Sequence, residues 1–254
     1  VELGRRFPGG NALNVAVYAS RLPGVRADYV GTVGTDLNGG FILDQIMAQG
    51  LDASKVLRWD GDTAVTTILV RGGERVFTHY LEGVQKAATL PLEALPDPSG
   101  YDLIHFSVWG FGREHIPNIR ETSGALLSCD FSNQLDDPRT GIMSHLDYSF
   151  FSGRHLAETG VDPEAKLKEL KERTPGVVAM TRGEYGSLVY DGEKTYRGKS
   201  HPVETVDTLG AGDSWIAAFL CSRLKGETME ESIEKGHRAA AETCRRLGAW
   251  GGNP

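Results

Sequence analysis

A glycine-rich turn that runs into an apolar helix pattern is the segment of this chain whose residue types best fit a chemical role. Residues 206–214 have the sequence VDTLGAGDS. Gly210 and Gly212 allow backbone conformations that other residues avoid, so a ligand can approach the main chain closely. The helix that follows presents N–H groups and a positive dipole end at this turn, which favours an anion. Asp213 places a carboxylate beside that anion site, and the combination indicates phosphoryl transfer to an alcohol.

A structural role for Asp213 has to be weighed against this chemistry, because aspartate is a common helix cap. The longer pattern D-T-x-G-A-G-D-S is more specific than a capped turn. It resembles the C-terminal signature of the ribokinase-like sugar kinases, the phosphofructokinase B family. The resemblance implies that Asp213 is the catalytic base and that the anion hole is formed by the amides of Gly210, Ala211 and Gly212. It also implies a role in holding nucleotide phosphates, and in some members a monovalent cation, for the first residues of the motif, Asp207 and Thr208.

A second polar segment, residues 9–14 with the sequence GGNALN, opens another helix pattern near the start of the chain. The glycines let the backbone approach a sugar, and Asn11 and Asn14 lie on one helix face at a spacing of i, i+3. Their amides can bond hydroxyl groups. The alternative is that Asn11 caps the helix and that Asn14 is only solvated. The segment resembles the sugar-contacting G-G-N-x-x-N pattern of the same family, which implies substrate contacts for Gly9, Gly10, Asn11 and Asn14.

Two further loops resemble motifs of this family. Residues 33–39 match V-G-x-D-x-x-G, where Asp36 either contacts substrate or organises the turn and caps the next helix. Residues 181–186 resemble a T-x-G-x-x-G nucleotide loop, although many β-turns have a similar sequence. That resemblance implies that Thr181 bonds a phosphate or a metal-bound water, and that space for ATP is left by Gly183 and Gly186.

The metal motif of the family is altered in this chain. Members commonly carry N-x-x-E after the strand that corresponds to residues 148–151, where it organises the waters of Mg²⁺. Residues 152–155 are instead Ser-Gly-Arg-His, and Glu158 follows three residues too late. A neutral imidazole is a poor ligand for Mg²⁺, which prefers oxygen. Either the metal position is altered or Glu158, phosphates and water supply it, so we expect ATP and Mg²⁺ but assign no protein ligand.

Other phosphate-binding motifs are not supported. Gly198-Lys199-Ser200 has the end of a Walker A motif, but Glu193 stands where the motif needs its first glycine. The segment also continues into His201-Pro202 and not into a helix. No G-x-G-x-x-G follows a strand pattern, so we expect neither a P-loop nor a Rossmann dinucleotide site.

The elements that must position these loops alternate along the chain. Short apolar strands are expected at residues 29–33, 103–106, 127–131, 148–151 and 177–181. Helices are expected at residues 11–22 and 38–49, from Asp162-Pro163 through Leu170, from Asp213 through Leu224, and from the capping box at Thr228–Glu231 to about Gly248. The alternation predicts an α/β fold. The family resemblance implies the ribokinase-like three-layer α/β/α sandwich with a mostly parallel central sheet and ligands beyond the carboxyl ends of the strands.

Two β-rich runs, residues 63–70 and 75–81, interrupt this alternation and are joined by the hairpin sequence Arg71-Gly72-Gly73-Glu74. We interpret them as part of a small β-lid, formed by roughly residues 1–10 and 60–84, on a single domain that spans residues 1–254. A lid fits a kinase because phosphoryl transfer must exclude water. Only eight residues precede Gly9. We therefore expect that the family's first strand, with an acidic contact to the sugar, is missing.

Composition excludes several classes of protein. A length of 254 residues with 40% hydrophobic and 24% charged residues is typical of a globular domain. The net charge of −7 leaves no basic surplus for binding nucleic acid. No run of eighteen or more apolar residues appears, so we expect no transmembrane helix, and we expect no signal peptide. Reduced thiols are the best interpretation of the widely spaced Cys129, Cys221 and Cys244. We expect a cytoplasmic protein whose partners are a sugar and ATP, and a homodimer stays open.

Within the family, the chain resembles the fructoselysine 6-kinases, which are bacterial fructosamine kinases, over nearly its whole length. The segments that carry this resemblance are GGNALNVAVY (9–18), ERVFTHYLEGV (74–84), HFSVWG (105–110), DFS (130–132) and GAW (248–250). The resemblance implies transfer of the ATP γ-phosphoryl group to a primary hydroxyl, most specifically O6 of fructoselysine or a related fructosamine.

Contacts to the amino-acid part of such a substrate are less specific. Glu82 in the predicted lid either pairs with the substrate amine or is a solvated charge. For Arg75 and Trp109 we favour structural roles, a solvated hairpin charge and a core indole. Three alternatives stay open: a kinase for ribose, 2-keto-3-deoxygluconate or a nucleoside such as adenosine; a non-catalytic sugar-binding regulator of the same fold; and a structural or partner-binding domain.

Overall fold

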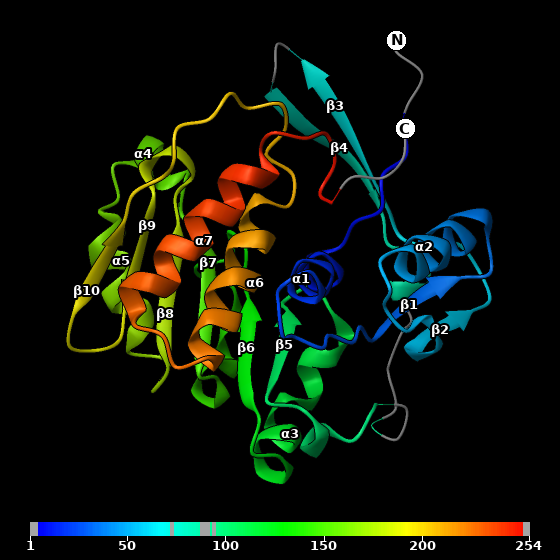
Figure 1. The fold of residues 1–254 in the computed structure, drawn as a ribbon, viewed down its shortest axis with the longest axis horizontal. Helices are drawn as coiled ribbons and strands as arrows, with labels where there is room; N and C mark the ends of the chain where they lie inside the picture. The colour runs from blue at the N-terminus through cyan, green and yellow to red at the C-terminus, as the bar shows by residue number, and fades with distance from the viewer. Residues whose placement is uncertain (1–4, 72–73, 87–91, 93–94, 251–254) are drawn as a thin grey trace. The chain divides into compact units, whose positions relative to one another are not determined.

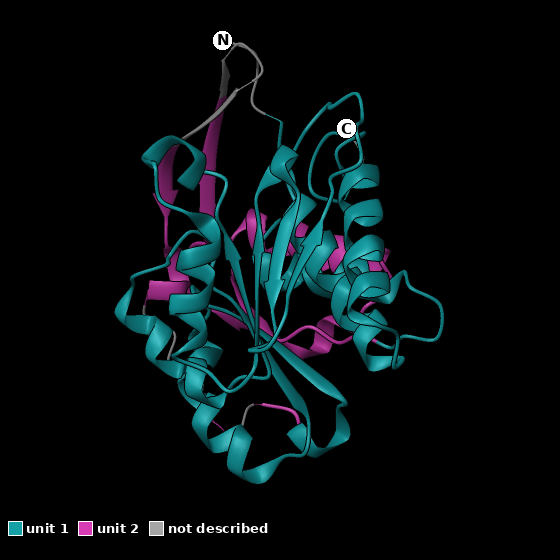
Figure 2. Cartoon of the chain, turned by 90° about the vertical axis from the view of Figure 1, so that its left-hand side faces the viewer, with its two compact units in different colours: residues 1–26, 97–254 teal, residues 27–96 magenta. Residues whose placement is uncertain are grey.

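The computed structural model describes residues 5–71, 74–86, 92 and 95–250 of the chain. The chain divides into two compact units, residues 1–26 with 97–254 and residues 27–96 (Figure 2). Each unit has its own helices and strands. None of the helices in the described ranges is long and apolar enough to cross a membrane.

The larger unit is built around a six-stranded sheet with the strand order β10-β9-β8-β7-β6-β5 (Figure 1). Neighbouring strands from β5 to β8 run parallel, whereas β9 is antiparallel to both of its neighbours. The strands are β5 (Leu103–Ser107), β6 (Leu126–Asp130), β7 (Tyr148–Ser152), β8 (Val177–Thr181), β9 (Ser187–Tyr190) and β10 (Thr195–Gly198). The four parallel strands lie where the sequence predicts them, which confirms an α/β fold with a mostly parallel sheet.

The hairpin of β9 and β10 is not predicted from the sequence. Each strand has only four residues, too few for a clear alternating pattern, so pairing with β8 decides their structure. The turn between them is fixed by Asp191, whose carboxylate accepts the N–H groups of Glu193 at 2.8 Å and Lys194 at 2.7 Å. Gly198 ends β10, and the following residues form no helix, in agreement with the absence of a P-loop.

Helices of the larger unit lie on both sides of its sheet (Figure 2). Helix α6 packs against α1 and α7 on one side, and α5 packs against β8 and β9. The helices are α1 (Asn11–Ser20), α3 (Ile116–Thr122), α4 (Leu156–Thr159), α5 (Pro163–Lys171), α6 (Ala211–Leu224) and α7 (Met229–Thr243), with short 3₁₀ helices at 98–100, 111–115, 138–145 and 183–185.

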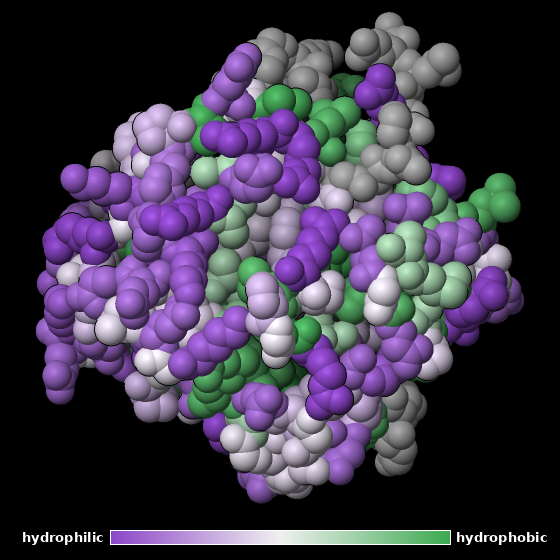
Figure 3. Space-filling model, viewed as in Figure 1, coloured by the Kyte–Doolittle hydropathy of each residue, from purple (hydrophilic) through white to green (hydrophobic). Residues whose placement is uncertain are grey.

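Helix α7 has the predicted start and an earlier end. Thr228 and Glu231 form the predicted capping box. The helix ends at Thr243, not near Gly248, because the Cys244 carbonyl accepts the N–H groups of Val206 at 2.8 Å and Asp207 at 3.2 Å. These bonds tie the end of α7 to the glycine-rich turn. The solvent side of α7 is hydrophilic (Figure 3).

An aromatic cluster anchors α6 to the sheet. Trp215 and Phe219 stack with ring centroids 4.9 Å apart, and both rings pack edge-on against Phe150 of β7. All three side chains are buried. Buried aromatic pairs of this kind are worth about 0.5–1.5 kcal/mol beyond their area burial. Because Trp215 lies two residues after Asp213, this packing fixes the first turn of α6 and the carboxylate on it.

The smaller unit contains two two-stranded sheets and one α-helix among its described residues. β1 (Gly31–Gly34) pairs parallel with β2 (Val56–Trp59), and β3 (Val65–Arg71) pairs antiparallel with β4 (Glu74–Leu81). Helix α2 (Leu37–Ala48) and the 3₁₀ helices Ala53–Lys55 and Gly83–Lys86 complete it. The predicted hairpin is confirmed, although Gly72 and Gly73 of its turn lie outside the described residues. Strand β1 starts at Gly31, two residues later than predicted, and strand β2 is not predicted from the sequence.

The N-terminal part of the predicted lid is not a strand in the structure. Residues 5–10 have no regular secondary structure, and they group with the larger unit and not with the hairpin. Residues 1–4 lie outside the described ranges. The assignment of residues 1–10 and 60–84 to one lid therefore stays a prediction.

Candidate active site

The glycine-rich turn lies at the start of α6 and places Asp213 in the first helical turn. Gly210 is the N-cap and has a left-handed backbone with φ of 77°. A Cβ at this position would also lie 2.9 Å from the Cβ of Ala249. Only glycine meets both conditions without strain. The backbone shape of this turn, and so the position of the Asp213 carboxylate, depends on glycine at 210.

The Asp207 carboxylate holds the start of this turn. It is buried and accepts the N–H groups of Leu209 at 2.7 Å and Gly248 at 2.9 Å. The next residue, Thr208, is exposed, and its carbonyl accepts the Ala211 N–H at 3.2 Å. Asp207 therefore joins the turn to the segment after α7. Contacts of Asp207 and Thr208 to nucleotide phosphates stay predictions.

The first turn of α6 has room for an anion beside Gly212. None of the described atoms outside the turn lies within 4 Å of the place that a Gly212 Cβ would take. N–H groups in the first helical turn have no preceding helical carbonyl to bond, so Gly212 and Asp213 present donors there. Of the three residues predicted to form the anion hole, Ala211 already uses its N–H within the turn. Of these residues, Gly212 has open space beside it, and binding of a phosphate there stays a prediction.

Asn14 is a direct partner of Asp213 and not a solvated helix residue. Its Nδ2 donates to Asp213 Oδ2 at 2.7 Å, and its side chain is buried. Its Oδ1 accepts the indole N–H of Trp250 at 2.6 Å. An indole nitrogen can only donate, so this bond sets which way the Asn14 amide points. The bond from Trp250 therefore orients the Asn14 amide so that its Nδ2 donates to Asp213.

Asn11 reaches a second carboxylate, which the sequence does not single out as a site residue. Asn11 Nδ2 donates to Asp130 Oδ2 at 2.7 Å. The helix cap is Gly10, and no side chain caps this helix, so the interpretation of Asn11 as an N-cap is wrong. Asp130 ends β6 and is buried. The signal that could have found it is an aspartate that directly follows a predicted apolar strand, where ligands of α/β sheets bind.

Both carboxylates have a raised pKa. Burial, and after it the charge of Asp130, raises the pKa of Asp213 to about 7, against the opposing hydrogen bond from Asn14. Burial also raises the pKa of Asp130, opposed by the bonds from Ser132 and Asn11. A carboxylate that titrates near neutral pH can accept a proton from an alcohol and release it again. The electrostatics of the site therefore fit a general base at position 213.

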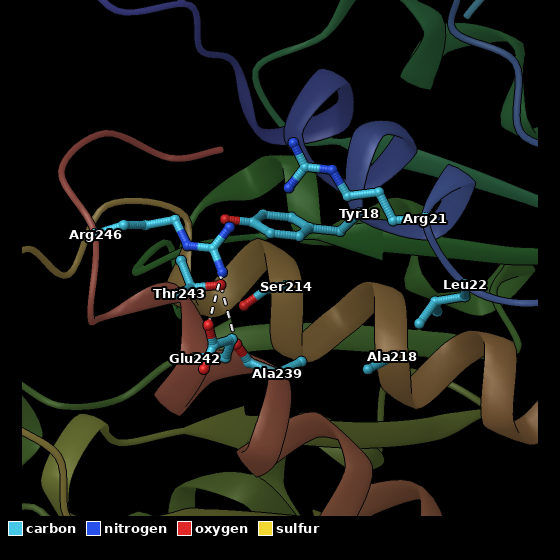
Figure 4. A pocket seen from close by; sticks show the side chains of 9 residues that line it. All are labelled: Tyr18, Arg21, Leu22, Ser214, Ala218, Ala239, Glu242, Thr243 and Arg246. Atoms are coloured by element: carbon cyan, nitrogen blue, oxygen red, sulfur yellow. Dashed lines mark hydrogen bonds and ion pairs between the residues drawn. The ribbon is translucent and has the colours of Figure 1, made fainter. Parts of the chain in front are cut away.

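A pocket with a volume of about 200 Å³ lies beside Ser214, between α1, α6 and α7 (Figure 4). The Tyr18 hydroxyl points toward Thr243 and Arg246 there. Burial raises the pKa of Tyr18, with a smaller contribution from the charge of Asp213. No residue that the sequence predicts for the site lines this pocket, so we assign it no role in the reaction.

The predicted nucleotide loop follows β8 as expected, but the local backbone geometry by itself requires its two glycines. Gly183 and Gly186 have φ of 59° and 80°. A Cβ on Gly186 would lie 2.0 Å from the Gly198 carbonyl oxygen, so β10 alone requires glycine there. Thr181 ends β8, and its hydroxyl donates a weak bond of 3.5 Å to the Phe151 carbonyl. Binding of ATP by this loop stays a prediction.

Asp36 and Glu82 belong to the smaller unit. Asp36 caps α2 by accepting the Gly39 N–H at 2.9 Å, and it also accepts the Thr63 hydroxyl at 2.6 Å. This confirms the capping interpretation, while a contact of Asp36 to substrate stays a prediction. Glu82 is exposed just after β4. The Arg75 side chain lies outside the described parts of the structure.

Trp109 is not a core residue, so that prediction is wrong. Its side chain is 49% exposed, and the Arg139 guanidinium lies 4.3 Å from the ring centroid. The apolar pattern does not distinguish an indole at the end of a strand from one inside it. An exposed tryptophan covered by an arginine is a surface that a ligand can contact.

The altered metal motif does not form an obvious metal centre. Arg154 pairs with Glu184 at 3.1 Å, and Glu158 is exposed on α4. In the described ranges, no group of three histidine, cysteine or acidic side chains is arranged to hold a metal ion.

Comparisons with known proteins extend the resemblance to the whole chain. Residues 3–254 match the pfkB family carbohydrate kinases. The chain is 36% identical over 250 residues to fructoselysine 6-kinase of Escherichia coli, covering 98% of this chain and 94% of that protein. It is 32% identical over 255 residues to fructosamine kinase FrlD of Bacillus subtilis, covering 96% of this chain and 86% of that protein.

The fold has counterparts among solved structures. A ribokinase from Thermotoga maritima superposes with a TM-score of 0.80 at 22% identity, covering 96% of this chain and 83% of that chain. At this identity the likeness supports the ribokinase-like fold alone. The sequence matches confirm the family predicted from the glycine-rich motifs, and with it the ATP-dependent kinase activity. The chain belongs to the pfkB family of carbohydrate kinases.

Proposed function

We propose that this chain transfers the γ-phosphoryl group of ATP to O6 of fructoselysine or a related fructosamine. The observation that carries the proposal is the Asp213 carboxylate in the first turn of α6, held by Asn14 at 2.7 Å beside the open space at Gly212. The substrate class follows from the similarity to relatives that are named for fructoselysine and fructosamine.

The reaction is an in-line displacement at phosphorus. The sugar oxygen forms a bond to the γ-phosphorus while the bond from that phosphorus to the bridging β,γ oxygen breaks, and ADP leaves. Asp213 accepts the hydroxyl proton. Asn14 bonds Oδ2, so we assign Oδ1 as the accepting oxygen. General-base help of this kind contributes about 10²–10⁴-fold to the rate.

The amides at the start of α6 stabilise the charge on the moving phosphoryl group. Gly212 carries most of this role, because Ala211 already donates to the Thr208 carbonyl and Gly210 supplies the left-handed turn. Preorganised donors aimed at developing charge cost no reorganisation during the reaction. The sugar is assigned to the start of α1, at Gly9, Gly10, Asn11 and Asn14. The side-chain amides of Asn11 and Asn14 also orient the carboxylates of Asp130 and Asp213.

The nucleotide is assigned to the loops at Thr181, Gly183, Gly186, Asp207 and Thr208. Mg²⁺ would neutralise the phosphates and would be held by their oxygens and water, with Glu158 as a candidate outer contact. A monovalent cation beside Asp207 is a further candidate. Asp36 and Glu82 are assigned to the substrate, Glu82 as the partner of its amine.

The exposed apolar side chains of the hairpin support association of two copies. Leu69, Tyr80 and Leu81 are each more than 40% exposed, and exposed apolar side chains favour burial against a partner. Sedimentation velocity of the chain and of a Leu69→Lys/Leu81→Lys variant tests this homodimer. A monomer for both proteins would contradict it.

An acceptor panel tests the substrate. Fructoselysine, fructose, ribose, 2-keto-3-deoxygluconate and adenosine are offered with MgATP, and ADP release is followed by a coupled assay. We expect the highest kcat/KM with fructoselysine and a phosphorus–proton coupling that places the product phosphate on C6. Turnover of ribose or adenosine without fructoselysine would replace the substrate class. Sugar binding without any turnover would indicate a regulator.

A further inference from the structure

One face of α1 holds two aspartates side by side. Asn11 and Asn14 are one helical turn apart, so their side chains start about 5–6 Å from each other. Each donates its Nδ2 to a carboxylate at 2.7 Å, Asn11 to Asp130 and Asn14 to Asp213. The two carboxylates come from different elements, the end of β6 and the start of α6. Helix α1 therefore sets the spacing of a carboxylate pair.

The donors that hold this pair are all uncharged among the residues that the structure describes. Asp130 accepts the Asn11 amide and the Ser132 N–H at 2.7 Å, and Asp213 accepts the Asn14 amide. Charged hydrogen bonds would let both carboxylates ionise at little cost, whereas neutral donors in a buried site do not. Because the two carboxylates carry like charges, ionisation of one aspartate raises the pKa of the other.

The backbone around Asp130 is strained in a way that fixes its carboxylate. Ser132 has φ of 53°, the one positive φ among the described residues that are not glycine. Its N–H donates to Asp130 Oδ1, and its carbonyl accepts the Ser152 N–H at 2.6 Å. A left-handed backbone is unfavourable for a residue with a side chain and persists where the surroundings impose it. The carboxylate of Asp130 is thus held in place and does not simply cover a strand end.

We propose that Asp130 is a positioning residue for proton transfer, whose ionised carboxylate keeps Asp213 basic enough to take the proton of the substrate hydroxyl. This inference rests on the proposed role of Asp213 as the base. Asp130 itself accepts no proton from the substrate. Its effect acts through charge across the short gap that α1 sets.

The groups that face Asp213 decide the sign of this effect. From β6 it faces Asp130, and from α1 it faces Tyr18 and the neutral Asn14. The charges of Arg21 and Arg246 act on Tyr18, and the charge of Arg113 acts on Cys129, the neighbour of Asp130. Burial and the negative charge of Asp130 raise the pKa of Asp213, and only the Asn14 bond lowers it. Removing the charge at position 130 must therefore lower the pKa of Asp213.

The test is the pH dependence of kcat/KM for Asp130→Asn. Asparagine keeps the size of the side chain and can still accept the Ser132 N–H. We expect the midpoint of the acid limb to move down by about one to two pH units, because a unit charge about 5–6 Å away at an effective dielectric of about 20 shifts a pKa by roughly two units and burial remains the larger cause of the raised pKa. Asp136→Asn is the matched control, because Asp136 is 74% exposed and pairs with Lys166 on the surface. Its acid limb should coincide with that of the wild type.

A titration without turnover separates this inference from the proposed function. The side-chain carboxyl carbon of Asp213, assigned by comparison with Asp213→Asn, is followed by NMR from pH 4 to 9 in the full chain without substrate. We expect a main step near pH 7 in the wild type and a step at lower pH in Asp130→Asn. The wild-type trace should also show a smaller inflection where Asp130 titrates, because coupled groups report on each other.

Three outcomes have distinct meanings. An Asp130→Asn protein that loses activity with an unmoved acid limb and an unmoved Asp213 titration would overturn the inference, since a purely structural role moves neither. If Asp130→Asn does not fold, a single-step wild-type titration with no second inflection would overturn it as well. A shifted NMR titration in a protein that phosphorylates no acceptor would uphold the coupling and reject the proposed function.

Discussion

Asn14→Ala should shift the activity of this kinase to higher pH. The Asn14 amide donates to Asp213 Oδ2 at 2.7 Å and lowers the pKa of that carboxyl. Alanine removes this donor and leaves burial and the Asp130 charge unopposed, so the pKa of Asp213 rises. The shift is opposite in sign to that of Asp130→Asn, and the two variants together test one electrostatic account.

The magnitude follows from the strength of the lost bond. A hydrogen bond to a charged group contributes about 1.5–3 kcal/mol, which is about one to two pH units at roughly 1.4 kcal/mol per unit. Starting from a pKa of about 7, Asp213 would be ionised in about a tenth of the molecules or fewer at pH 7, compared with about half in the wild type. At pH 7 kcat/KM should therefore fall about fivefold or more, and part of the loss should be recovered at pH 9.

The assay is kcat/KM for the best acceptor between pH 5.5 and 9.5. Asn118→Ala is the matched control, because Asn118 is an exposed asparagine on α3. Alanine at 14 also leaves the buried indole N–H of Trp250 without its acceptor, which costs about 1–3 kcal/mol of stability. Thermal melts therefore accompany the kinetics. An acid limb that stays in place or moves to lower pH in a folded Asn14→Ala protein would refute the reasoning.

Three further predictions concern the same turn. Asp213→Asn should raise Tm at pH 8 by a few degrees and have a smaller effect at pH 4. The folded pKa of Asp213 lies above its unfolded value, so this carboxyl makes the folded protein less stable as pH rises through about 7. Equal shifts in Tm at both pH values would contradict this. Gly210→Ala should lower the free energy of unfolding by about 1–3 kcal/mol, because alanine is strained at φ of 77° and meets Ala249; urea titration measures it, and an unchanged midpoint would be inconsistent with the turn described. Gly212→Ala should stabilise the protein by about 0.5–1 kcal/mol in the same titration, since alanine is the better helix former. It should also reduce kcat at least about tenfold, because its methyl group enters the space assigned to the phosphate. A stable and fully active variant would contradict the assignment of the phosphate to this space.

The sequence predicts the parallel part of the sheet because its strands are buried on both sides. Strands β5 to β8 are short runs rich in apolar residues and bounded by polar loops, and this pattern is local. The pair β9 and β10 has four residues in each strand and depends on contact with β8. The end of α7 is likewise set from a distance, by bonds from Val206 and Asp207 to the Cys244 carbonyl.

The candidate site shows the same division. Asp213, Gly210 and Gly212 are recognisable because their types and spacing lie in one short segment. Asp130 is separated from Asn11 by 119 positions, and its importance appears only when both side chains are placed. Asn14 is predicted as a sugar contact, but its bonds to Asp213 and Trp250 come from residues more than 190 positions away. Contacts of this range leave no periodic pattern in a single sequence.

The most direct test of the central claim is steady-state turnover of Asp213→Asn with MgATP and the best acceptor. Asparagine keeps the shape of the side chain and can still meet the Asn14 amide, but it cannot accept the substrate proton. We predict a loss in kcat of at least about a hundredfold, with ATP binding by calorimetry and the circular dichroism spectrum unchanged. A variant that binds ATP and turns over within a few fold of the wild type would contradict the assignment of Asp213 as the base.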